Sequence, residues 1–124
     1  AFGDIDNDGD VDIVLTNNNG PARLLLNAVG NQQHWVGLRL VDPATNRDML
    51  GTRVAVIPVG GTPSWRRVRS DGSYASANDP RVLFGLGTNS EIEGVQAIWP
   101  DGTLETWTSV QTDQWVTLSR GTGQ

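Results

Sequence analysis

Short stretches of alternating apolar and polar residues, separated by turn-forming residues, run along most of the chain. Strict alternation is typical of half-buried β-strands, and no stretch carries the apolar spacing of three and four residues that indicates a helix. The pattern predicts strands over nine ranges: Val11–Thr16, Ala22–Leu26, His34–Val41, Thr52–Val59, Ser64–Arg69, Arg81–Phe84, Gly94–Trp99, Leu104–Thr108 and Trp115–Ser119. Eight or nine short strands predict an all-β fold, either a β-sandwich or a barrel-like domain.

Turn-forming residues mark the ends of these strands. Residues 17–21 read Asn-Asn-Asn-Gly-Pro, and residues 100–102 read Pro-Asp-Gly, which is a hairpin signal. The two glycines within residues 84–87 predict a bulge or a close backbone approach at a strand end. Residues 27–33 form a polar connector without a hydrophobic period. We therefore divide the chain into an N-terminal hairpin over residues 1–27 and a β domain over residues 34–120.

Five aspartates occupy alternate positions near the N-terminus: Asp4, Asp6, Asp8, Asp10 and Asp12. Ca²⁺ takes about 6–8 oxygen ligands, and carboxylates at loop positions 1, 3 and 5, followed by a glycine at position 6, suit it. We expect the side chains of Asp4, Asp6 and Asp8 to bind the ion directly. We expect Asp10 to offer its backbone carbonyl and Asp12 to complete the ligand set. The alternative interpretation is an acidic surface turn that binds nothing.

The residues after the acidic loop distinguish it from an EF-hand. Position 12 of the loop is Leu15, where an EF-hand needs a bidentate Glu. The residues from Val11 to Thr16 are rich in β-branched side chains, which favour a strand. The calcium loop is therefore expected between two strands of a hairpin. We expect that hairpin to pack on the β domain, because Ile13, Leu15, Leu24 and Leu26 need cover.

Composition limits the classes of function. The net charge is −5, and the acidic loop holds five of the fourteen acidic residues, so nine acidic residues balance nine arginines elsewhere. No basic stripe indicates nucleic-acid binding. The absence of cysteine and lysine excludes disulfides, thiolate zinc sites and Schiff-base chemistry. A calcium site of modest affinity fills outside the cytosol, so we expect a periplasmic, extracellular or cell-surface location.

Two further features of the sequence bear on its context. No stretch of the sequence reads as a signal peptide or a membrane span. Almost nothing precedes the acidic loop, and we expect the chain to derive from a longer protein.

Three groups of residues have both a functional and a structural interpretation. His34 is the one conventional catalytic base, but it has no accompanying nucleophile motif and is interpreted as structural. The five tryptophans either stack on sugars or pack in the core, and their positions in strands favour packing. Arg66, Arg67 and Arg69 form either an exposed strand face or a docking patch for an acidic partner, such as the acidic loop of another copy.

The acidic segment from Phe2 to Asp12 resembles the calcium repeat of FG-GAP/VCBS β-propellers. Residues 34–120 resemble the ASPIC/UnbV domain that follows such repeats in cartilage-acidic-protein-like proteins. The second resemblance is carried by an ordered series of short motifs: Asn46-Arg47-Asp48 with Gly51, Ser73-Tyr74, Asp79-Pro80-Arg81, Phe84-Gly85-Leu86-Gly87 and Trp99-Pro100-Asp101-Gly102. One departure is Met49-Leu50 before Gly51. The resemblance implies a secreted or surface-attached protein with a propeller upstream of this domain.

The sequence supports three hypotheses of function. The first is a non-enzymatic, calcium-stabilised extracellular module for adhesion, protein–protein interaction or subunit assembly, whose partner is another protein or copies of itself. One variant of it adds the N-terminal strands to a neighbouring sheet and so forms filaments. The second hypothesis is a carbohydrate-binding module of a secreted multidomain protein. The third is an accessory enzyme of secondary metabolism, suggested by the UnbV name alone and disfavoured by the single histidine.

Overall fold

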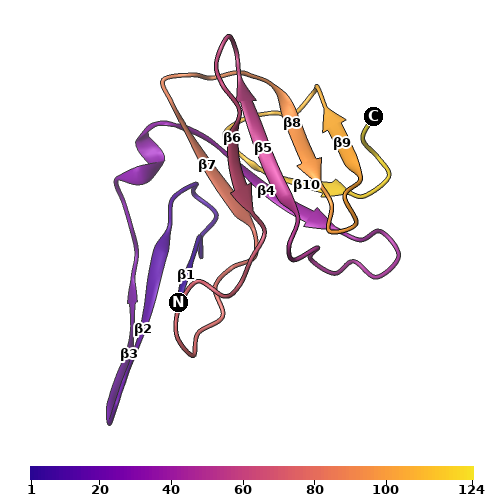
Figure 1. Cartoon of the computed structure of the whole chain (residues 1–124). Helices are drawn as coiled ribbons and strands as arrows, with labels where there is room; N and C mark the ends of the chain where they lie inside the picture. The colour runs from indigo at the N-terminus through magenta and orange to yellow at the C-terminus, as the bar shows by residue number, and fades with distance from the viewer.

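The computed structural model describes residues 1–124 and contains strands and one short 3₁₀ helix (Figure 1). The elements are β1 (Phe2–Gly3), β2 (Asp12–Asn17), β3 (Gly20–Leu25), η1 (Gly30–Gln32), β4 (His34–Val41), β5 (Arg53–Pro58), β6 (Ser64–Arg67), β7 (Val82–Gly87), β8 (Ile92–Ile98), β9 (Leu104–Trp107) and β10 (Trp115–Ser119). The prediction of an all-β fold is confirmed, and no sheet closes into a barrel. No helix has the length and hydrophobicity that crossing a membrane requires.

Two sheets enclose the hydrophobic core. One has the strand order β10-β4-β7, and the other has the order β6-β5-β8-β9. Alternate side chains of each strand point towards the other sheet, and these side chains are fully or almost fully buried. The core comprises Val36, Leu38, Leu40, Val54, Val56, Val68, Val82, Phe84, Val95, Ala97, Trp99 and Leu118. This arrangement is a β-sandwich.

The last strand of the chain pairs with β4 in parallel. Trp115 lies opposite Gly37, and the pairing continues to Ser119 opposite Val41. Parallel neighbours need a long connection, and here the chain forms β5 to β9 before β10 returns to β4. The residue pattern predicted both strands but gave no sign that they are neighbours.

Two turn predictions are confirmed. The register between β4 and β7 shifts where His34 and Trp35 face Gly87 and Gly85, so the glycines occupy a bulge at a strand end. Gly102 has a φ of 88° in the turn that joins β8 to β9. A side chain at that φ is disfavoured, which explains the glycine.

The third sheet, β1-β2-β3, lies beside the sandwich, and its β2–β3 hairpin projects away from it (Figure 1). The expectation that the hairpin leucines pack on the β domain is wrong. Leu15, Leu24 and Leu26 are 44%, 51% and 57% exposed. The acidic loop contacts the sandwich instead, and these contacts hold the hairpin by its base.

Truncation of core and hairpin leucines should therefore have unequal effects. Leu38→Ala creates a cavity between the two sheets and should lower the free energy of unfolding by about 2–5 kcal/mol. Leu24→Ala removes the same atoms from the exposed hairpin and should change it by less than about 0.5 kcal/mol. Chemical denaturation measures both. Equal losses would show that the hairpin is packed in solution.

Candidate metal site and its junction with the sandwich

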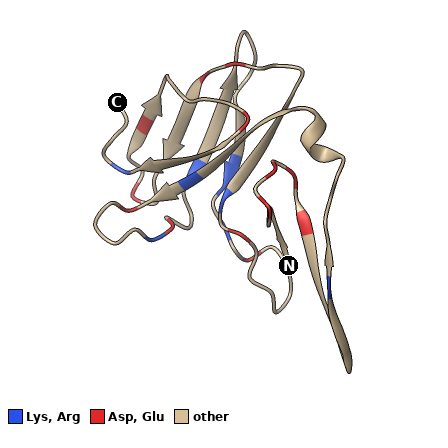
Figure 2. Ribbon diagram, turned by 180° about the vertical axis from the view of Figure 1, so that it is seen from behind, with Lys and Arg blue, Asp and Glu red and all other residues tan.

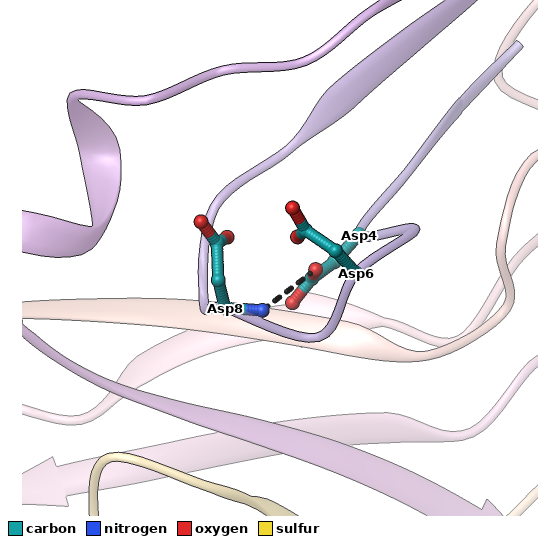
Figure 3. A group of neighbouring side chains, drawn as sticks. All are labelled: Asp4, Asp6 and Asp8. Atoms are coloured by element: carbon teal, nitrogen blue, oxygen red, sulfur yellow. Dashed lines mark hydrogen bonds between the residues drawn. The ribbon is translucent and has the colours of Figure 1, made fainter.

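The acidic loop, residues 4–12, connects β1 to β2 and brings three carboxylates together. One oxygen from each of Asp4, Asp6 and Asp8 lies within 4.8 Å of the other two (Figure 3). The tight turn needs left-handed backbone at Asn7, with a φ of 61°, and at Gly9, with a φ of 97°. Asn tolerates this region and Gly adopts it without steric cost, so the local sequence fits the turn.

Backbone amides hold the first carboxylate at the centre of the loop. The amide of Asp8 donates to Asp4 Oδ1 at 3.1 Å (Figure 3). The amide of Gly9 donates to Asp4 Oδ2 at 3.0 Å. The amide of Asp10 donates to Asp8 Oδ1 at 3.2 Å. These bonds wrap the loop around Asp4, which is only 4% exposed. The loop therefore supplies, from its own nine residues, the three amide bonds that wrap it around Asp4.

Asp10 is a buried carboxylate with no hydrogen-bond partner. It is 3% exposed, and both of its side-chain oxygens lack a partner. Desolvation and the nearby Asp8 carboxylate raise the pKa of Asp10, and the same two causes raise the pKa of Asp6. The amides of Gly30 and Asn31 approach Asp10 and oppose this rise, but neither reaches hydrogen-bond geometry. An unpaired buried carboxylate is costly, so a positive charge here would be stabilising.

Asp12 has a different environment from the other aspartates. It is 1% exposed, and its two oxygens accept hydrogen bonds from the amides of Ile5 and Asn27 at 2.8 and 2.9 Å. These bonds join the start of the loop to the end of the hairpin. The structure thus groups Asp4, Asp6 and Asp8 and leaves the nearby Asp10 side chain without a hydrogen-bond partner. Asp12 instead links two parts of the hairpin through its hydrogen bonds. The role of Asp12 as a metal ligand stays a prediction.

The donor set fits a hard divalent cation. All the available side-chain groups are oxygens, and the clustered carboxylates repel one another without a counter-charge. Asn31 of η1 donates to Asp8 Oδ2, so the connector lies over one side of the loop. Gly30 permits this close approach, because a Cβ there would lie 2.6 Å from the Asp10 Cβ. Asp4, Asp6 and Asp8 are the residues that would hold the ion.

Arg81 fastens the acidic loop to the sandwich. Its guanidinium donates to the side-chain oxygen of Asn7 at 2.6 Å and to the backbone carbonyl of Asp4 at 2.7 Å. Asp79 Oδ2 holds the same guanidinium, accepting its Nε–H at 2.7 Å and lying 2.6 Å from its Nη2. The guanidinium also lies 4.0 Å from the centre of the Trp115 ring, a cation–π contact. Arg81 thereby binds the backbone of the acidic loop, and Asp79 and Trp115 hold the Arg81 side chain in place.

Two tryptophans on the outer face of the β10-β4-β7 sheet complete the junction. Trp115 Nε1 donates to Asp4 Oδ2 at 2.9 Å. Trp35 packs so closely on Gly9 that a Cβ there would lie 2.0 Å from Trp35 Cε2. The two indole rings meet edge to face with centres 5.9 Å apart. The loop thus covers this outer face of the sheet. Trp35 is therefore buried, even though it points away from the core that Val36 faces.

Arg81, Trp115 and Asn31 contact the acidic loop, and the sequence did not single them out for it. The sequence places Arg81 in a family motif, and the position of Trp115 in a strand predicts packing in the core. The bond from Trp115 joins residues 111 positions apart, and that from Arg81 to Asp4 joins residues 77 apart. No local pattern in a single sequence signals contacts of such separation.

His34 lies away from the acidic loop and pairs with Asp113. Its Nδ1 lies 2.7 Å from Asp113 Oδ2, while the amide of Trp35 donates to Asp113 Oδ1 at 3.1 Å. This hydrogen bond with His34 lowers the pKa of Asp113. These contacts link the start of β4 to the residues before β10. The structural interpretation of His34 stays a prediction.

The fold and the junction define an all-β domain with an N-terminal acidic loop docked on one sheet. Residues 42–124 match the family model described as ASPIC and UnbV, and the chain therefore belongs to this family. The matched region includes Arg81 and Trp115, whereas the acidic loop lies outside it. No match was found among curated proteins.

Gly9→Ala should loosen the junction. The new Cβ would collide with Trp35, and the φ of 97° is strained for alanine, so we expect a loss of more than about 1 kcal/mol in unfolding free energy. Gly60→Ala is the matched control, since Gly60 also has positive φ, at 65°, but a Cβ there meets nothing within 4 Å. Denaturation with tryptophan fluorescence measures both. A smaller loss in Gly9→Ala than in the control would contradict the close packing on Trp35.

The Asp113–His34 pair should give a pH-dependent contribution to stability. The folded pKa of Asp113 is lowered from its ordinary 3.8, so its contribution is present above about pH 4 and lost as the pH falls through the folded value. Asp113→Asn keeps a residue that tolerates the positive φ of 57° but removes the charge. The parent should melt above the variant at pH 6, and the difference should shrink as the pH falls below the ordinary pKa of 3.8. A constant difference would refute the assignment.

Proposed function

We propose that this chain is a non-enzymatic, calcium-binding extracellular module that takes part in adhesion, protein–protein interaction or subunit assembly. In this proposal Ca²⁺ binds the acidic loop, and the loop in turn covers one sheet of the ASPIC/UnbV domain. Ca²⁺ supplies charge compensation when bound. The residues of the chain set the loop shape, through Asp4, and its attachment, through Arg81 and Trp115.

One observation carries the proposal. The oxygens of Asp4, Asp6 and Asp8 lie within 4.8 Å of one another, next to a buried Asp10 carboxylate that has no partner. A like-charge cluster with a buried unpaired member is unfavourable without a cation. An acidic surface turn that binds nothing needs no buried carboxylate, so the metal-binding interpretation is favoured.

Two further assignments follow from the calcium site. The spacing and loop geometry support an FG-GAP/VCBS-type calcium repeat over residues 1–27. Free calcium is abundant outside the cytosol, where sites of modest affinity are filled, and this supports a periplasmic, extracellular or cell-surface location.

The N-terminal sheet supports the role in interaction. β3 is at the end of its sheet, and every residue in it is exposed. Four leucines within β2, β3 and the residue after it are between 44% and 57% exposed: Leu15, Leu24, Leu25 and Leu26. Exposed edges and clustered apolar side chains are typical of surfaces that pair with another polypeptide.

The carbohydrate-binding alternative has less support. Trp35 and Trp99 are buried. The Trp115 ring is in contact with the Arg81 guanidinium and packs closely on Gly37. Sugar stacking needs an open aromatic face. Of the five tryptophans, Trp65 is the most exposed, at 39%, and it already stacks with Arg53.

Thermal unfolding tests the calcium proposal. Excess Ca²⁺ should raise the midpoint relative to excess Mg²⁺ and to chelator, because an ion that binds only the folded loop adds roughly 2.7 kcal/mol at a hundredfold excess over the dissociation constant. Asp8→Ala should abolish the Ca²⁺-dependent rise. Glu91→Ala is the matched control, since it removes an exposed carboxylate far along the chain and should keep the full rise.

A second readout reports the ion itself. Tb³⁺ substitutes for Ca²⁺ at oxygen sites, and its luminescence is sensitised by nearby indole rings such as Trp35 and Trp115. Sensitised emission should appear in the parent and in Glu91→Ala and be lost in Asp8→Ala. A parent that shows neither a Ca²⁺-specific rise in midpoint nor sensitised emission would disprove the proposal.

A further inference from the structure

A cleft opens between the edges of the two sandwich sheets, next to the acidic loop. It has a volume of about 610 Å³ and lies between β6, at the end of one sheet, and β7, at the end of the other. Residues of β1 and of the loop before β7 also line it. Its size is within the range of about 300–1,000 Å³ that is typical of ligand pockets. We name it the basic cleft, because Arg66, Arg67, Arg69 and Arg81 line it.

Arginines outnumber carboxylates in the lining of the basic cleft, which holds four arginines and two aspartates. Asp79 is paired with Arg81, and Asp4 accepts three neutral N–H groups, so neither forms an ion pair with Arg66, Arg67 or Arg69. Arg69 forms no hydrogen bond or ion pair, and Arg66 has only a cation–π contact with Phe84, at 5.2 Å. Arg67 meets Asp71 at 3.3 Å in an ion pair whose side chains are 53% and 69% exposed, which contributes little. Arg66 and Arg69 therefore line this cleft without a carboxylate partner, in a protein whose net charge is −5; Figure 2 colours the arginines blue and the acidic residues red.

The backbone of β6 adds hydrogen-bonding groups along the same edge. The amide of Val68 donates to the carbonyl of Thr52 at 2.9 Å, and its carbonyl accepts from the amide of Gly51 at 2.9 Å. Alternate residues of an antiparallel strand direct their backbone groups to opposite sides. The backbone groups of Arg67, the last residue of β6, thus point away from β5, towards the open edge, where no strand is present.

We propose that the basic cleft binds an acidic peptide segment in extended conformation. The segment adds to the open edge of β6 through backbone hydrogen bonds, and its carboxylates pair with Arg66 and Arg69. Apolar side chains of the segment contact Phe2 and Val82, which line the same cleft. Charged residues also protect exposed edges from association, but that role does not require a cleft with an apolar lining.

The acidic loop links this site to calcium. Asp4 and Val11 line the basic cleft, so a cation bound in the loop makes the cleft more positive and favours an acidic ligand. The inference rests on the interaction role proposed above and identifies its partner class. The charges of Arg66 and Arg69 do not depend on the ion, so the acidic peptide should also bind in chelator, but more weakly.

Fluorescence anisotropy with a dye-labelled peptide of alternating Glu and Val tests the inference. The parent should bind this peptide and not its Lys–Val counterpart, and added salt should weaken the binding. Arg66→Gln with Arg69→Gln should weaken it about tenfold, because two arginine–carboxylate pairs are lost. Arg47→Gln removes an exposed arginine outside the cleft and should leave it unchanged.

Two more probes separate the parts of the inference. A Glu–Val peptide N-methylated at alternate residues should bind weakly, because it cannot pair with β6; equal binding would refute strand addition. An oligogalacturonate should not displace the peptide; binding of the oligogalacturonate alone would replace the peptide with an acidic glycan and overturn the proposal. No binding of any probe, together with a Ca²⁺-specific rise in melting midpoint, would reject the cleft and leave the calcium site standing.

Discussion

The carboxylate of Asp4 is the group on which the rest of the arrangement depends. It is almost fully buried and accepts hydrogen bonds from the amides of Asp8 and Gly9 within the loop and from the indole of Trp115 in the last strand. A buried charge is tolerated only when such donors replace water. The same contacts that satisfy this charge fold the loop and attach it to the sandwich. The shape of the loop and its packing on the sandwich therefore depend on the same hydrogen bonds.

This attachment explains the residue pattern of β4. Val36, Leu38 and Leu40 face the core, and in an exposed sheet the alternate positions would be polar. Instead Trp35 and Gly37 are buried as well, because the acidic loop and Trp115 cover them. Gly37 leaves space for the Trp115 ring, since a Cβ there would lie 2.3 Å from it. The outer face of this sheet is thus shaped to receive other parts of the same chain.

The family motifs acquire physical roles in the same way. In the Asp79-Pro80-Arg81 motif, Asp79 orients the guanidinium that holds the loop backbone. Asp48 pairs with Arg39 of β4 and so fixes the loop after that strand. Trp99 donates to the buried Glu105, which also accepts the amides of Gly121 and Gly123 and so holds the C-terminal segment. Only the first of these contacts reaches the candidate metal site, so among the motif residues it is Arg81 that joins Trp115 in linking the ASPIC/UnbV domain to the loop.

The sequence alone determined nine of the ten strands and the turns, because alternation, glycine and proline act over a few residues; the two-residue β1 is too short to show such a pattern. It also determined the clustering of Asp4, Asp6 and Asp8, since they lie in one short loop whose amides hold Asp4 and Asp8. Only the tertiary structure decided that β10 lies parallel to β4, that Arg81 and Trp115 hold the loop, and that the hairpin leucines stay exposed. Those outcomes depend on contacts between residues as many as 111 positions apart. Such contacts form when whole sheets pack, and no short stretch of sequence specifies its distant neighbour.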